Sequence, residues 1–211
     1  QAYQAFNARL LAEDAPADDE IVLTSGKSYS NVFHANGGSA SFSVMANTLR
    51  GVYGTDVLLA TANSFTGSVL QADYNQKMAA SMIMPNGLMS RQRTMTGAEL
   101  KETVRAFVEG CEGGFVPFNR GSLPVVSGIA VEVKEANGSY TLTGITRNGQ
   151  PLGDNDTVTV TCLATEKQME ALLASDSGTS AGEDTWVKNT WRDYVSGGAA
   201  LAEPENYITL R

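Results

Sequence analysis

The side chains that most often catalyse reactions or bind metal ions are scarce in this sequence. Its 211 residues include one histidine, His34, and two cysteines, Cys111 and Cys162. Most zinc sites and all disulfide-rich scaffolds need more of these residues, and a serine or cysteine nucleophile would need His34 as its base. We therefore expect no cofactor or metal in this chain. We interpret His34 as a surface or hydrogen-bonded histidine, with lone acid–base catalysis as the alternative.

Other residues could bind a small molecule rather than transform it. Asn63 and Phe65 follow the apolar segment 56–62, which has the length of a strand and does not alternate. Such a segment is predicted to be a strand buried on both faces, and loops after such strands commonly carry ligand sites. Phe65 could therefore offer a ring for stacking, and the alternative is that it packs into the core.

The segment 110–124, GCEGGFVPFNRGSLP, joins glycines to aromatic and basic side chains. It carries Phe115, Phe118, Asn119 and Arg120. These residues could contact a ligand or a partner, and the alternative is that the two rings pack beneath the loop.

Net charge and hydropathy exclude two classes of partner. The chain has 15 basic and 23 acidic residues, a net charge of −8, and such a chain repels a phosphate backbone. No window approaches the ~18 consecutive apolar residues of a membrane span. We therefore expect neither nucleic acid binding nor a membrane span. The chain begins at Gln1 without a signal peptide, which we interpret as a mature exported bacterial protein or a part of a longer one.

The first 20 residues differ from the rest of the chain. Residues 2–12 place apolar side chains near helical spacing, and residues 13–20, EDAPADDE, are acidic and contain proline. We predict a helix and an acidic linker that lead from an upstream region into a single domain, residues 21–211.

Within that domain, hydrophobic periodicity predicts a mixture of strands and helices. The predicted strands cover 21–24, 56–62, 82–84, 88–95, 125–134, 139–147, 156–164 and 207–210. The predicted helices cover 39–50, 71–79, 97–109, 165–173 and 185–195. Thr96 and Glu99 form a capping-box pattern, and Asn137-Gly138 and Asn148-Gly149 predict hairpin turns. The fold class is therefore α/β (mixed α+β), a mixed sheet flanked by helices.

Several of these segments, taken in order, resemble the C-terminal domain of the bacterial 5′-nucleotidase and UDP-sugar hydrolase family. Residues 95–101, MTGAELK, are similar to the strand and "T-G-x-x-L" helix of that family. Similar matches occur at 46–50 (ANTLR), 56–63, 71–74 (QADY), 84–87 (MPNG), 126–133 and 145–152. The resemblance covers about residues 39–165.

The resemblance implies a domain that recognises a nucleotide and presents its phosphate to a metallophosphatase-like domain upstream in the same chain. Divalent metals are then expected only in that upstream domain. Asn86 stands where the family has an aromatic residue that stacks on the base, and the loop after residue 62 lacks the family's phosphate-binding arginine.

The candidate substrate-binding residues are therefore Asn63, Phe65, Asn86, Phe115, Phe118, Asn119 and Arg120. The expected function is nucleotide recognition within a secreted phosphohydrolase of the extracellular space or cell envelope, without catalysis by this chain alone. The alternative is a degenerate, non-catalytic module of an exported bacterial protein that binds another small molecule or a protein.

Overall fold

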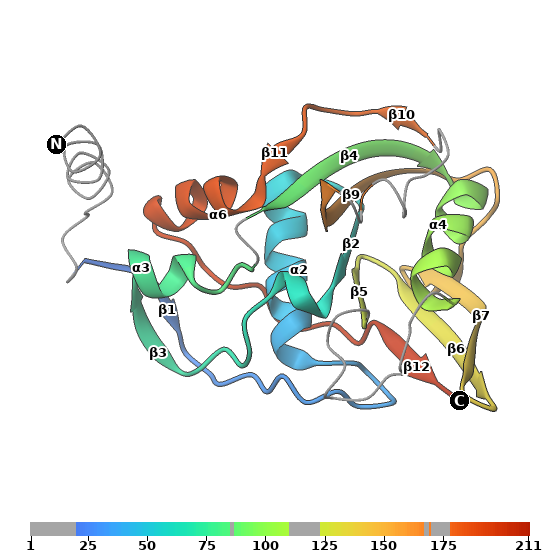
Figure 1. The fold of residues 1–211 in the computed structure, drawn as a ribbon, viewed down its shortest axis with the longest axis horizontal. Helices are drawn as coiled ribbons and strands as arrows, with labels where there is room; N and C mark the ends of the chain where they lie inside the picture. The colour runs from blue at the N-terminus through green and yellow to red at the C-terminus, as the bar shows by residue number, and fades with distance from the viewer. Residues whose placement is uncertain (1–19, 85–86, 110–122, 167–168, 170–177) are drawn as a thin grey trace, which may run out of the picture.

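The computed structural model describes residues 20–84, 87–109, 123–166, 169 and 178–211 (Figure 1). The predicted N-terminal helix and acidic linker, and most of the predicted helix 165–173, lie outside these residues. The described part combines helices with three sheets, so the predicted mixed α/β class is confirmed, although its strands do not form one sheet.

The most apolar strand of the largest sheet, β2 (Val57–Thr61), has a neighbour on each side. The strands of this sheet are β10 (Thr179–Ser180), β4 (Leu88–Thr96), β9 (Thr157–Thr165), β2 and β5 (Pro124–Ser127), in that spatial order, with β11 (Thr185–Trp186) also paired to β4. Strand β9 runs parallel to β2 and antiparallel to β4. Val57 to Ala60 are fully buried, as the absence of alternation predicts.

Two capped helices support this sheet. Helix α2 (Ala40–Tyr53) packs on β2 and β5, and the Ser39 hydroxyl accepts a hydrogen bond from Phe42 N at its start. It continues past residue 50, where the sequence predicts its end, and terminates at Gly54, with φ of 65°. Helix α4 (Gly97–Glu109) begins with the predicted capping box.

The second sheet is built from hairpins. Its strands are β12 (Ile208–Leu210), β6 (Ala130–Ala136), β7 (Ser139–Arg147) and β8 (Gln150–Pro151), and α4 packs on β7 (Figure 1). The two Asn-Gly turns form as predicted, with φ of 54° at Asn137 and 53° at Asn148.

Strand partners depart from the sequence prediction in this region. The predicted strand 125–134 is divided at Gly128 into β5 and β6, which belong to different sheets. Gly128 has φ of 82°, and a Cβ atom there would lie 2.0 Å from Asp56 O, so only glycine fits this crossing. Strand β9, which follows the second Asn-Gly turn, pairs with β2 and β4 and does not extend the hairpin of β7.

A smaller unit flanks α2 and consists of β1 (Ile21–Ser25), β3 (Ala72–Asn75), α3 (Gln76–Ala80) and α6 (Val187–Ser196). The predicted helix 71–79 is therefore wrong in its first half, and the predicted strand 82–84 is reduced to a bridge between Ile83 and Phe65. Trp191 is buried and donates from Nε1 to Ala79 O at 2.8 Å. Trp186, in contrast, is 50% exposed.

Candidate functional site

Several chain segments meet at the edge of the large sheet where the parallel strands β2 and β9 end. Thr61 lies opposite Pro124, and Leu88 lies opposite Thr165, so β4 and β5 begin at the edge where β2 and β9 end. Ligands of α/β proteins bind at the carboxyl ends of parallel strands, where loops supply the side chains. We call this region the β2–β9 edge.

The turn after β2 is held firmly at this edge. Residues Ala62–Ser64 form a short 3₁₀ helix, and Ala62 N donates to Leu123 O at 2.9 Å. Met84 N donates to Ser64 O at 3.0 Å, so the segment before β4 lies against the same turn. Asn63 stands between two buried neighbours and is itself exposed. Its amide is therefore presented to solvent from a fixed backbone.

Ser64 is a site residue that the sequence reasoning missed. Its side chain is 1% exposed, and within the described residues Ser64 Oγ has no hydrogen-bond partner. A buried hydroxyl without a partner costs roughly 1–3 kcal/mol, so such a group often marks a place where a ligand or water completes the hydrogen bonding. A single serine in a loop gives no signal in the sequence.

The Phe65 ring points into the core. It is 5% exposed, and its centroid lies 6.2 Å from the Phe42 centroid in a stacked arrangement with an interplanar angle of 29°. This burial favours the packing alternative over a stacking platform for a ligand.

The other predicted binding residues are not placed. Asn86, Phe115, Phe118, Asn119 and Arg120 lie outside the described residues, as does Cys111. Of the seven predicted residues, the structure therefore brings Asn63 and Phe65 to one turn, with only Asn63 facing solvent.

His34 and Cys162 lie in opposite environments, one at the surface and one in the core. His34 is exposed and exchanges two backbone hydrogen bonds with Gly38, which agrees with its interpretation as a surface histidine. Cys162 is a free thiol buried in β9, and burial raises its pKa to about 12. Within the described ranges, no three His, Cys, Asp or Glu residues are placed to hold a metal ion.

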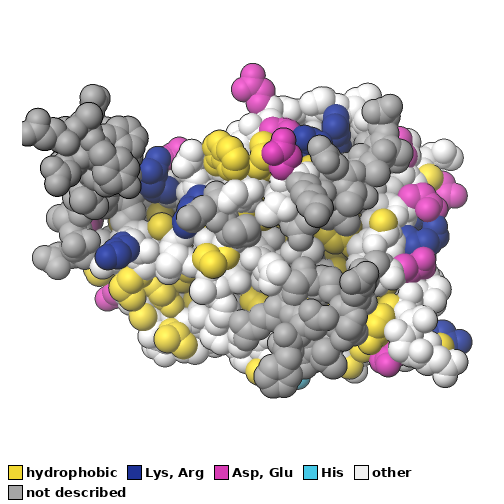
Figure 2. All heavy atoms as spheres, viewed as in Figure 1, with side chains coloured by type: hydrophobic (Ala, Val, Ile, Leu, Met, Phe, Trp, Pro, Cys, Tyr) yellow, Lys and Arg dark blue, Asp and Glu magenta, His cyan; other side chains and the backbone are white. Residues whose placement is uncertain are grey.

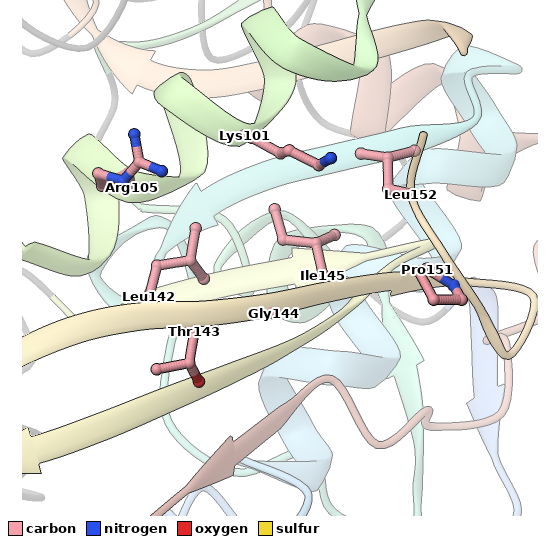
Figure 3. A pocket seen from close by; sticks show the side chains of 8 residues that line it. All are labelled: Lys101, Arg105, Leu142, Thr143, Gly144, Ile145, Pro151 and Leu152. Atoms are coloured by element: carbon pink, nitrogen blue, oxygen red, sulfur yellow. The ribbon is translucent and has the colours of Figure 1, made fainter. Parts of the chain in front are cut away.

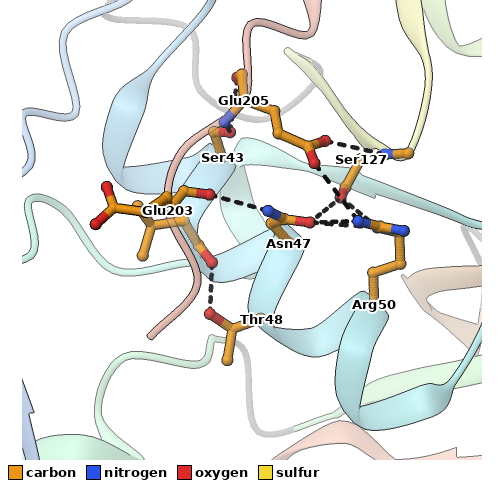
Figure 4. A network of polar contacts seen from close by, with 9 residues as sticks. Ser43, Asn47, Thr48, Arg50, Ser127, Glu203 and Glu205 are labelled. Atoms are coloured by element: carbon orange, nitrogen blue, oxygen red, sulfur yellow. Dashed lines mark hydrogen bonds and ion pairs between the residues drawn. The ribbon is translucent and has the colours of Figure 1, made fainter. Parts of the chain in front are cut away.

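A polar network joins α2 to the C-terminal segment (Figure 4). Arg50 donates from Nη2 to Asn47 Oδ1 at 2.7 Å and from Nε to Ser127 Oγ at 3.0 Å. Asn47 Nδ2 donates to Glu203 O at 2.9 Å, and Ser43 exchanges two hydrogen bonds with the Glu205 backbone. These contacts fix the segment that leads into β12.

Beside this network lies a cavity of about 410 Å³ whose charged groups are Arg50, Asp56, Arg147 and Glu205. Each has an opposite charge beside it, since Arg147 pairs with Asp56 and Arg50 with Glu205. One ion pair therefore links the residue before β2 to β7, and the other links α2 to the C-terminal segment. The sequence reasoning did not single out these residues, because their pairing depends on the crossing at Gly128.

Asp56 is the most strongly bound carboxylate of this cavity. It accepts hydrogen bonds from Thr159 N at 2.8 Å and Thr159 Oγ1 at 2.9 Å, and it pairs with Arg147. Burial raises the pKa of Asp56, but the hydrogen bonds from Thr159 and the positive charges of Arg147 and Arg50 outweigh it. The pKa of Asp56 therefore lies below its ordinary value.

Comparison with models of protein families and with curated proteins finds no match. Solved structures do match: the NAD nucleotidase NadN of Haemophilus influenzae has a TM-score of 0.70 at 17% identity, over 99% of this chain and 41% of that chain. A 5′-nucleotidase precursor from Thermus thermophilus matches with a TM-score of 0.67 at 14% identity, over 99% of this chain and 42% of that chain. The sulfate thiohydrolase SoxB from the same species matches with a TM-score of 0.66 at 13% identity, over 98% of this chain and 38% of that chain.

At these identities the likeness establishes the fold. The mixed α/β arrangement is like that of the 5′-nucleotidase C-terminal domain, as expected from the sequence, and the chain spans about two fifths of the length of these proteins. Among the helices of the described residues, none has both the length and the apolar character that a membrane crossing requires.

Proposed function

We propose that this chain is the substrate-recognition domain of an exported 5′-nucleotidase-like phosphohydrolase. An upstream metallophosphatase-like domain would supply the divalent metals and carry out the hydrolysis. The observation that carries the proposal is the match of 99% of this chain to about two fifths of a protein whose name states that it is an NAD nucleotidase. A domain of that extent has room for recognition and leaves catalysis to the remainder of the longer protein.

The β2–β9 edge is the place we propose for the nucleotide. Its turn presents the Asn63 amide to solvent, and the Ser64 hydroxyl has hydrogen-bonding capacity that no described residue uses. The Asn63 amide suits ribose and base atoms, since it offers two donors and an acceptor. The edge also follows the general rule for ligand sites in sheets with parallel strands.

Thermal unfolding with AMP, adenosine and UDP-glucose tests this proposal. A ligand at ~100 times its dissociation constant adds roughly 2.7 kcal/mol, which raises the melting temperature of a chain this size by about 5–10 °C. Asn63→Ala should reduce the shift, whereas Asn155→Ala should not, because Asn155 is an exposed asparagine in the turn before β9, at the opposite edge. The absence of a shift with all three compounds at millimolar concentration would contradict the proposal.

One observation favours a second function, a non-catalytic module that binds another small molecule or a protein. The Phe65 ring packs in the core, so it is not available to stack on a base. Under this alternative the nucleotides cause no shift, and Asn63→Ala and Asn155→Ala behave alike.

A further inference from the structure

A groove between α4 and β7, which we call the α4–β7 groove, has a volume of about 310 Å³ (Figure 3). We infer that it binds a small organic anion with an apolar ring system, such as an aryl carboxylate. Sites for small molecules begin at about this volume. The inference does not depend on nucleotide recognition, because the groove lies by the turn that precedes β9, whereas the β2–β9 edge lies where β9 ends.

The floor of the groove is apolar because of an irregularity in the β6–β7 pairing. The register shifts between Glu132 and Val133, opposite the segment Leu142–Gly144. Leu142 and Ile145 consequently both point toward α4 although they are three residues apart, whereas Thr143 points to the other face (Figure 3). Leu152 and Pro151 close one end of the groove.

The wall above this floor is cationic. Lys101 and Arg105 are four residues apart on α4, so they share one face of the helix, and both line the groove. No Asp or Glu is among the described residues that line it. Two basic side chains beside an apolar floor suit an anion that carries a ring system.

Lys101 and Arg105 form ion pairs with surface carboxylates, and an anion can replace these carboxylates at a small cost in folding free energy. Lys101 Nζ pairs with Asp154 Oδ1 at 2.6 Å, and the Asp154 side chain is 71% exposed. Arg105 pairs with Glu102 and Glu109 on its own helix, also at the surface. Figure 2 shows basic and acidic side chains side by side over this part of the molecule. Exposed pairs of this kind contribute little to stability, so exchanging a partner leaves the fold intact.

The experiment titrates the 211-residue chain with 2-naphthoate by calorimetry and by NMR of methyl groups. We expect saturable binding, with shifts at the Leu142, Ile145 and Leu152 methyl groups and none at Ile21, which is exposed on β1. Neutral 2-naphthamide and acetate, which lack the charge and the ring system respectively, should each bind at least about fivefold more weakly, given the usual strength of a hydrogen bond to a charged group.

Lys101→Gln is compared with Lys134→Gln, which removes the same charge from an exposed site on β6. Lys101→Gln should weaken 2-naphthoate binding about fivefold, and Lys134→Gln should leave it unchanged. The inference is overturned by the absence of binding at about 10 mM, by equal affinity for the amide, by equal effects of the two variants, or by methyl shifts outside the groove. Circular dichroism confirms that both variants are folded.

Discussion

Replacing Gly97 with alanine tests the contact between α4 and the turn before β9. A Cβ atom at Gly97 would lie 1.9 Å from Gly153 O, whereas ordinary contact begins at 3.4 Å, so the turn would have to retreat by about 1.5 Å. Two hydrogen bonds cross this contact, from Gly97 N to Asp156 O at 2.7 Å and from Ala98 N to Asp154 O at 3.0 Å.

The free-energy change follows from these contacts. Each hydrogen bond contributes about 1 kcal/mol, and overpacking costs roughly 1–3 kcal/mol. Alanine recovers at most ~1 kcal/mol because it favours helix more than glycine does. We therefore expect Gly97→Ala to lower the free energy of unfolding by about 2–5 kcal/mol.

Gly51→Ala is the matched control. Gly51 lies within the last turn of α2, and a Cβ atom there would meet nothing within 4 Å. Only helix propensity and the entropy of the unfolded chain then change, so the variant should be about 0.5–1 kcal/mol more stable.

Urea denaturation followed by circular dichroism measures both variants. With a slope of about 2 kcal/mol per molar, Gly97→Ala should lower the midpoint by about 1–2.5 M, and Gly51→Ala should raise it by about 0.25–0.5 M. The reasoning is refuted if Gly97→Ala is as stable as the parent chain, or if the two substitutions have the same sign.

Two further predictions concern polar contacts, one partly buried and one fully buried. Because the folded pKa of Asp56 lies below its unfolded value, its ionised form stabilises the fold above that unfolded pKa, and this contribution is lost as pH falls through the folded value. Asp56→Asn should therefore be about 1 kcal/mol less stable at pH 7, and this difference should shrink as pH falls below the unfolded pKa, as measured by urea titrations from pH 7 into the acid range. Trp191→Phe should lower the free energy of unfolding by about 1–3 kcal/mol, because it removes the hydrogen bond to Ala79 O and leaves a cavity. Trp186→Phe, at a half-exposed position, should change it by less than about 0.5 kcal/mol. Equal effects of the two substitutions would contradict the core position of Trp191.

Features decided within a few residues were predicted correctly from the sequence. The capping box of Thr96 and Glu99 and the turns at Asn137 and Asn148 depend on local hydrogen bonds and on φ angles that asparagine and glycine tolerate. The limits of α4 and β7 agree with the prediction for the same reason.

Features decided by distant residues were not predicted. The alternation of residues 125–134 continues through Gly128, and only the approach of Asp56 O explains why the chain leaves one sheet there and enters another. An isolated glycine within a strand pattern was the available signal. At the candidate site, residue type indicated the turn at Asn63. It could not show that the Phe65 ring points into the core, because residues in a loop do not alternate between faces as they do in a strand.

The parallel pairing of β12 with β6 has a consequence for biosynthesis. Val131 N donates to Tyr207 O, and Arg211 N donates to Val133 O, so β6 has a neighbour on this side only when residues 207–211 are present. The ribosome makes β6 some seventy residues before it makes β12, and during that interval a valine-rich strand has one open edge. Open edges recruit other chains, so nascent copies on neighbouring ribosomes are most prone to associate in this window.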